Sequence, residues 1–84
     1  MTCYTVYLYD KDNDDYSQGY VCRTEEEART VAEALQSLIK QDMIINRDMY
    51  NEPYDWVEII KYSNDNTVPT GEKIAVYPED YGKD

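Results

Sequence analysis

The chain contains no histidine and no phenylalanine, and it has only eight lysines and arginines against 18 aspartates and glutamates. Without histidine it lacks the usual general base, the usual proton shuttle and the commonest metal ligand. The formal charge of −10 at pH 7 opposes nucleic-acid binding, because that binding depends on cations that replace the counterions of phosphates. The composition therefore argues against histidine-based catalysis and against a protein that binds DNA or RNA itself.

Long apolar runs are also missing. No stretch of about 18 apolar residues occurs, so no segment has the length of a membrane-spanning helix. The first ten residues have neither a basic start nor a long apolar stretch, and we expect a cytoplasmic protein without a secretion signal. The chain, residues 1–84, suits a single domain, and a mean hydropathy of −0.82 indicates a small core.

Residues for covalent or metal chemistry are scarce. Cys3 and Cys22 are too few for a zinc site in a chain without histidine, and we expect both to be reduced thiols. The three glycines match no phosphate-binding loop. Glu58 falls among apolar and aromatic neighbours, but with 18 acids one such neighbourhood is expected by chance. We expect no enzyme, no catalytic residue, no cofactor and no metal site.

Tyrosine is abundant instead, with ten copies beside a single tryptophan. A tyrosine ring can be buried while its hydroxyl contacts water or a partner, and tyrosine is enriched at interfaces for this reason. Tyrosine also suits half-buried strands in place of phenylalanine. Both explanations stay open for individual tyrosines.

The N-terminal quarter of the sequence predicts a β-hairpin. Cys3–Tyr9 alternates in the manner of a strand, Tyr16–Cys22 predicts a second strand, and the polar segment Asp10–Asp15 separates them. A turn centred on the middle of that segment gives three cross-strand pairs: Tyr9 with Tyr16, Tyr4 with Val21, and Cys3 with Cys22.

The next segment predicts a helix from Glu25 to Gln41. Thr24 and Glu27 match a capping box, with Thr24 as the N-cap and Glu27 as the third helical residue. Three glutamates in the first turn also suit the positive end of the helix dipole. Apolar residues then recur at spacings of three and four along one stripe: Ala28, Val31, Ala32, Leu35, Leu38 and Ile39.

The second half of the chain predicts two further strands, Trp56–Ser63 and Lys73–Tyr77, the latter ended by Pro78. Two alternatives are open for Met43–Ile45, an extension of the helix or a short buried link, and Asn46–Asp55 is expected to be a loop. Turn residues are expected at 64–66 and 69–71, and we expect the tail, residues 79–84, to fray.

This order of elements predicts an α+β domain in which one helix packs on one face of a three- to four-stranded, mainly antiparallel sheet (β-β-α-β-β). The aliphatic strand positions are the natural partners of the helix: Val6, Leu8, Val21, Val57 and Ile59. The alternation then places a largely aromatic set on the opposite face: Tyr7, Tyr9, Tyr16, Tyr20, Trp56, Ile60 and Tyr62.

A single helix covers only one face of such a sheet. A contiguous apolar patch of roughly several hundred Å² on the other face marks an interaction site. Three coverings are open: a fold-back of Asn46–Asp55 or of the C-terminal segment with Tyr77 and Tyr81, a foreign partner, or a second copy of the chain.

Acidic residues concentrate at the predicted hairpin tip, where Asp10, Asp12, Asp14 and Asp15 are offset only by Lys11. The Asp-x-Asp-x-Asp spacing copies the first ligands of a calcium-binding loop, but the glycine and the glutamate that such a loop requires further along are absent. A field of one sign steers a protein toward cationic surfaces and raises association rates.

Three features carry a resemblance: the tyrosine-rich strand Tyr4–Tyr9, the acidic tip Asp10–Asp15, and the helix that opens with Thr24–Glu27. In general type the chain resembles small acidic accessory proteins of bacteriophages and other mobile elements, including anti-CRISPR proteins and other nucleic-acid mimics. The resemblance is compositional and architectural. It implies an inhibitor of a host or defence protein, in the cytoplasm of a bacterial host, that acts by occlusion without chemistry of its own.

We therefore expect a non-enzymatic acidic protein that docks on a basic partner, such as a nucleic-acid-binding enzyme or a CRISPR effector, and inhibits it by occlusion. Direct binding to nucleic acid or membrane is not expected. The competing hypothesis is a structural homodimer or assembly component that uses the aromatic sheet face as its interface. The expected partner-binding residues are Tyr7, Tyr9, Asp10, Asp12, Asp14, Asp15, Tyr16, Tyr20, Trp56 and Tyr62.

Overall fold

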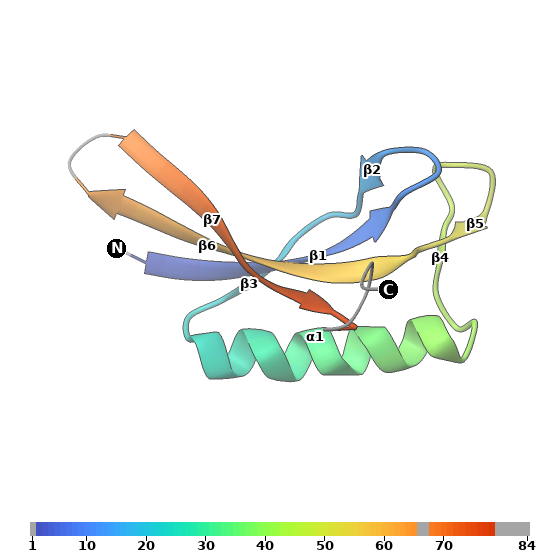
Figure 1. The fold of residues 1–84 in the computed structure, drawn as a ribbon, viewed down its shortest axis with the longest axis horizontal. Helices are drawn as coiled ribbons and strands as arrows, with labels where there is room; N and C mark the ends of the chain where they lie inside the picture. The colour runs from blue at the N-terminus through green and yellow to red at the C-terminus, as the bar shows by residue number, and fades with distance from the viewer. Residues whose placement is uncertain (1, 66–67, 79–84) are drawn as a thin grey trace, which may run out of the picture.

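The computed structural model describes residues 2–65 and 68–78, and these form one helix, a five-stranded sheet and a separate two-stranded sheet (Figure 1). The elements are β1 (Thr2–Asp10), β2 (Asp15–Tyr16), β3 (Tyr20–Cys22), α1 (Glu25–Lys40), β4 (Ile45–Asn46), β5 (Glu52–Pro53), β6 (Trp56–Asp65) and β7 (Val68–Tyr77). The predicted tail, residues 79–84, lies outside the described residues.

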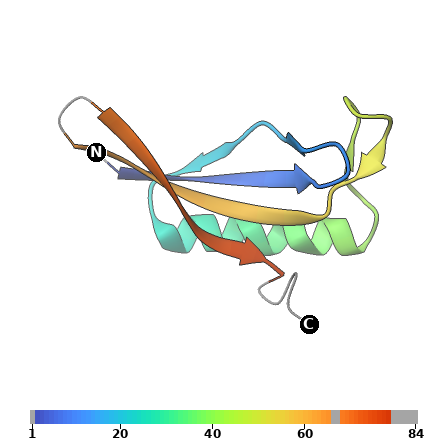
Figure 2. The same ribbon diagram turned by 45° about the horizontal axis from the view of Figure 1, so that its top comes forward.

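The sheet is antiparallel throughout, with the order β2-β1-β6-β7, and β3 pairs with the same edge of β1 as β2 does. Figures 1 and 2 show α1 running along one face of this sheet, while the short β4-β5 hairpin lies at one end of it. The predicted α+β class, with one helix on a mainly antiparallel sheet, is therefore confirmed.

The helix begins as the capping box predicts. The backbone N–H of Glu27 donates to the Thr24 hydroxyl at 3.1 Å, so Thr24 is the N-cap. The Glu27 carboxylate accepts from the backbone N–H of Arg23 at 3.3 Å, one residue before the position that the capping box specifies. The last helical residue is Lys40, and Gln41 forms the C-cap.

The core lies between α1 and the helix-facing side of the sheet. The predicted core residues are buried there or, like Val31, Leu38 and Ile39, half-buried against the core. Val21 is the exception because it is 72% exposed. Two tyrosines and a cysteine complete the buried set, which comprises Val6, Leu8, Cys22, Ala28, Ala32, Leu35, Tyr54, Val57, Ile59 and Tyr77.

The predicted register of the first hairpin is correct at its tip and wrong beyond it. Tyr9 pairs with Tyr16 as expected. Strand pairing with β1 is interrupted between β2 and β3. At this point the Ser17 hydroxyl accepts from the backbone N–H of Leu8 at 2.9 Å, where a strand carbonyl would otherwise accept. The segment between β2 and β3 therefore contains one residue more than the facing part of β1. The pairs become Tyr4 with Cys22, Thr5 with Val21, and Val6 with Tyr20.

This shift exchanges the faces of the β3 residues, since side chains alternate along a strand. Cys22 turns to the core, and Tyr20 shares the helix-facing side with its partner Val6. Val21 turns to the opposite side. The prediction that Tyr20 belongs to the aromatic face is therefore wrong, and Cys3 and Cys22 are not cross-strand neighbours.

The last strand, β7, is longer than the strand predicted at Lys73–Tyr77. Residues 69–71 continue the pairing with β6, so the turn predicted there is wrong, and part of the other predicted turn lies outside the described residues. The register shifts by one residue between Ile59 and Ile60, which lets both Ile74 and Ala75 pack against the core. The same shift places Lys73 opposite Ile60, on the face that the helix does not cover.

The segment between α1 and β6 is more ordered than the loop predicted for it. Asp42 has a φ of 54°, a left-handed conformation that ends the helix. The β4-β5 hairpin follows, and Tyr54 then enters the core.

The corrected register predicts different behaviour for the two thiols. Cys3 pairs with Tyr62 on the uncovered face, whereas Cys22 is buried on the helix side, where burial and the charge of Glu27 raise the pKa of its thiol. We expect Cys3 to be alkylated at least about tenfold faster than Cys22. Mass spectrometry of partially alkylated protein measures both rates, and in denaturant the two should become similar. An intramolecular disulfide formed without unfolding would contradict this register.

Candidate functional site

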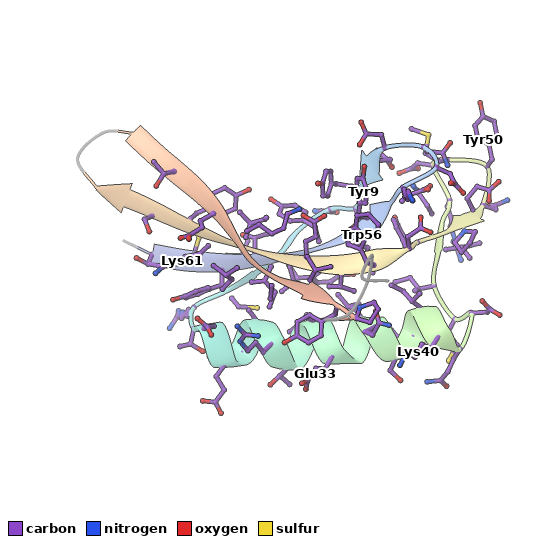
Figure 3. The ribbon with its side chains drawn as sticks, in the orientation of Figure 1. Tyr9, Glu33, Lys40, Tyr50, Trp56 and Lys61 are labelled. Carbon is purple, nitrogen blue, oxygen red and sulfur yellow. The ribbon has the colours of Figure 1, made fainter. Side chains whose placement is uncertain are left out.

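The face of the sheet turned away from α1 carries a cluster of mainly aromatic side chains from β1, β2 and β6. We call this cluster the aromatic face. Its members follow from the strand alternation and from the register of the first hairpin: Tyr7, Tyr9, Tyr16, Trp56, Ile60 and Tyr62. Figure 3 shows Tyr9 and Trp56 together on this side of the sheet, while Glu33 lies on the far side of α1.

The described residues of the two segments considered as covers pack elsewhere, not over the aromatic face. Tyr54, from the link before β6, is part of the core beneath the helix. Tyr77 is also part of that core, and its hydroxyl accepts from the Arg29 guanidinium at 3.0 Å. Tyr81 lies outside the described residues. Within the part of the chain that the structure describes, no helix covers this face, and Tyr16 remains 48% exposed.

The rings of the aromatic face pack against one another in a row. The centroids of Tyr9 and Trp56 are 4.8 Å apart, and those of Tyr9 and Tyr16 are 4.5 Å apart. Tyr7 meets Tyr16 edge to face at 5.9 Å. These tilted and edge-on arrangements are the favourable ones for aromatic pairs, so the cluster is held in place before any partner binds.

Glu58 lies among these rings and is only 1% exposed. The indole N–H of Trp56 donates to Oε2 of Glu58 at 2.7 Å, and the Tyr16 hydroxyl lies 3.5 Å from both carboxylate oxygens. Lys73 Nζ lies 3.5 Å from Oε1. A buried carboxylate is stable only when it is paired and hydrogen-bonded, and these three partners meet that requirement.

Two glycines leave room for the outer tyrosines of the cluster. Tyr62 pairs with Gly71 across the strands, and a Cβ on Gly71 would come within 2.9 Å of Cε1 of Tyr62. A Cβ on Gly19 would come equally close to the Tyr7 ring, at 2.9 Å. The two hydroxyls then meet at 3.2 Å, and this hydrogen bond together with burial raises the pKa of Tyr7 to about 12.

An open hollow of about 460 Å³ lies between these tyrosines and β7. It is lined by Tyr7, Tyr16, Ile60, Tyr62, Gly71 and Lys73. Its walls are therefore mainly aromatic, its hydroxyls offer acceptors, and its ammonium group is the partner of Glu58.

The acidic tip is built differently from the prediction. Asp10 is fully buried (0% exposed). Its carboxylate accepts from the Asn13 side chain at 2.7 Å and from the Asn46 side chain at 3.2 Å. Burial acts to raise the pKa of Asp10, but these hydrogen bonds outweigh burial and lower it. Asp10 therefore cannot contact a partner, and its prediction as a partner-binding residue is corrected.

The other tip acids are engaged to different degrees. Asp15 accepts from the Asn46 side chain at 2.9 Å, and Asp14 accepts a hydrogen bond from the Tyr9 hydroxyl. The bond to Asp14 raises the pKa of Tyr9 to about 12. Asp12 and Asp14 are exposed and remain on the surface, and the bond from Tyr9 places Asp14 beside the aromatic face. The tip acts first as a hydrogen-bonded turn and second as a source of negative charge.

The structure thus brings together five of the predicted residues, all aromatic: Tyr7, Tyr9, Tyr16, Trp56 and Tyr62. It separates Tyr20, on the helix side, and Asp10, in the interior. The site also contains Glu58, Lys73 and Gly71, which the sequence analysis did not select. The sequence signal for Glu58 is its alternation with Trp56 and Ile60, which puts an acid between apolar residues on one face.

No protein-family model, no characterised protein and no solved structure matches this chain. Among the residues that the structure describes, no helix is long and apolar enough to cross a membrane. The same residues hold no group of three or more histidine, cysteine, aspartate or glutamate side chains that is placed to bind a metal ion. The aromatic face, with the hollow beside it, is the candidate functional site.

Replacing Asn46 by alanine tests the tip. Asn46 is buried and donates to both Asp10 and Asp15, so its loss should reduce the free energy of unfolding by about 1–3 kcal/mol near neutral pH. Because the pKa of Asp10 is lowered in the folded state, its stabilisation is present above pH 3.8 and is lost as the pH falls further. Denaturant unfolding should therefore show the difference between wild type and Asn46→Ala shrinking in acid.

The exposed Gln18 supplies the control, since Gln18→Ala should change stability by no more than about 0.5 kcal/mol. Equal effects of the two substitutions would contradict the structural role of the tip.

The aromatic face also predicts an alkaline transition. The pKa values of Tyr7 and Tyr9 are raised from 10.0 to about 12, so the folded state holds these protons more tightly than the unfolded state. Their stabilisation should be complete below pH 10 and should be lost as the pH rises toward 12. Phenolate absorbance should show a component near pH 12 that is reduced in Tyr7→Phe relative to wild type. A titration of Tyr7→Phe that is the same as that of wild type near pH 12 would contradict the assignment.

Proposed function

We propose that this chain is a non-enzymatic acidic binding protein that docks its aromatic face on a cationic surface of a protein partner. The observation that supports it most is the pre-packed row of rings on the face that α1 leaves uncovered. Aromatic anchors at the centre of a patch supply most of the binding energy at protein interfaces. The partner is a nucleic-acid-binding protein, and docking inhibits it by occluding its binding surface.

The charge supports a cationic partner. The formal charge is −10, and exposed acids such as Asp12, Asp14 and Glu72 are available on the surface. A field of this sign raises the rate of encounter with a basic surface and disfavours acidic partners. Proteins that bind nucleic acid present basic surfaces, because they neutralise phosphates. An acidic protein with exposed rings therefore competes for the place of a nucleic acid.

The same charge disfavours the competing homodimer. Two copies that meet through their aromatic faces would bring together two chains of charge −10 each, and like charges repel. We therefore infer a foreign partner rather than a second copy, and light scattering should find a monomer.

A pair of arginine substitutions with the same charge change tests the docking face. Tyr16→Arg removes an exposed ring and places a cation where a cationic surface is proposed to dock, whereas Ala34→Arg adds the same charge to the exposed side of α1. Affinity capture from a lysate of the native host should recover a basic nucleic-acid-binding protein with wild type and with Ala34→Arg. Tyr16→Arg should lower the affinity by at least about tenfold.

High salt should weaken the same complex, and the wild-type chain should block nucleic-acid binding by the captured protein. Equal affinity of the two variants, or a stable dimer in light scattering, would contradict the proposal.

A further inference from the structure

We infer that the hollow beside Glu58 receives an arginine side chain of the partner, whose guanidinium takes the place of Lys73 next to the Glu58 carboxylate. This inference rests on the proposed docking through the aromatic face and names the chemical group that the face recognises. It follows from the buried carboxylate that two lining residues, Lys73 and Tyr16, contact, from the nature of the walls and from the space within the hollow.

One oxygen of the Glu58 carboxylate has only long contacts. Oε2 is held by the Trp56 indole at 2.7 Å, whereas Oε1 faces Lys73 Nζ and the Tyr16 hydroxyl, each at 3.5 Å. Charge-assisted hydrogen bonds between nitrogen and a carboxylate are shorter, at about 2.7–2.9 Å. Lys73 therefore neutralises the buried charge without a close hydrogen bond. Its side chain is 52% exposed, so it can turn into water when another cation arrives.

The walls of the hollow favour a guanidinium over an ammonium. The rings of Tyr7, Tyr16 and Tyr62 line it, and their hydroxyl oxygens can accept hydrogen bonds. A guanidinium is planar, stacks on aromatic rings and has five donors, so it can bond to Oε1 and to a tyrosine hydroxyl together. An ammonium is compact and strongly hydrated, and it gains less from such walls.

The space and the surrounding charge agree with this guest. The hollow of about 460 Å³ lies within the range of about 300–1,000 Å³ that is typical of binding pockets. Of the two β7 residues that line it, Gly71 has no side chain to fill the space, and Lys73 is the residue that the guest would displace. The chain as a whole has a charge of −10, which attracts a cationic side chain to this face.

The experiment uses the full-length chain and a small probe, N-acetyl-arginine amide, with N-acetyl-lysine amide as the matched comparison. Titration followed by ¹H–¹⁵N NMR should show saturable shifts at the indole N–H of Trp56 and at the amide of Gly71. The lysine probe should bind about fivefold more weakly, since it lacks the planar stacking group.

Three variants test the role of the carboxylate. Glu58→Gln, which keeps the shape but removes the charge, should weaken binding of the arginine probe by at least about tenfold. Glu33→Gln removes the same charge from the far side of α1 and should stay within about twofold of wild type (Figure 3). Lys73→Gln removes the internal competitor and should strengthen binding by about twofold or more.

Absence of saturable shifts at Trp56 and Gly71, equal binding of the two probes, or equal binding by wild type and Glu58→Gln would each overturn the inference. The inference and the proposed function fail separately. Loss of probe binding while Tyr16→Arg still weakens the partner complex removes only the arginine site. Specific probe binding in a chain whose partner complex is unaffected by Tyr16→Arg removes the docking function.

Discussion

The interaction on which the uncovered face depends is the neutralisation of the Glu58 carboxylate in the interior of a cluster of rings. A charge that is 1% exposed must be paired and hydrogen-bonded, and the Trp56 indole and Lys73 ammonium do both. The indole that satisfies the carboxylate is also packed against Tyr9, and the neighbouring Tyr16 ring lies against Tyr9 and Tyr7. One buried acid thereby fixes the positions of the aromatic side chains.

The consequence for function is a binding surface that is already ordered. Side chains that are locked by packing lose less conformational entropy when a partner binds than free ones do. The hairpin tip adds to this order, because Asp10 and Asn46 anchor the turn from inside while Asp12 stays on the surface. Rings then act as anchors, surface acids direct the encounter, and neither role requires catalytic chemistry.

The sequence predicts the parts of this fold that follow from regular periods. Alternation in β1 and β6 places Val6 and Val57 under the helix and Trp56 on the other side, and the box at Thr24 locates the helix start. The sequence does not predict that the Ser17 hydroxyl takes the place of a strand carbonyl as acceptor. This replacement shifts the pairing of β3 with β1 by one residue. A single inserted residue reverses the faces of a strand, so Tyr20 and Val21 were exchanged.

The most direct test of the account uses Trp56, the single tryptophan of the chain, which lies in the aromatic face. Its fluorescence can be quenched by acrylamide with and without the captured partner. Quenching should fall markedly in the complex, since the partner covers the rings around Glu58. Quenching that is unchanged when the complex is fully formed would show that the partner binds elsewhere, and the central claim would be wrong.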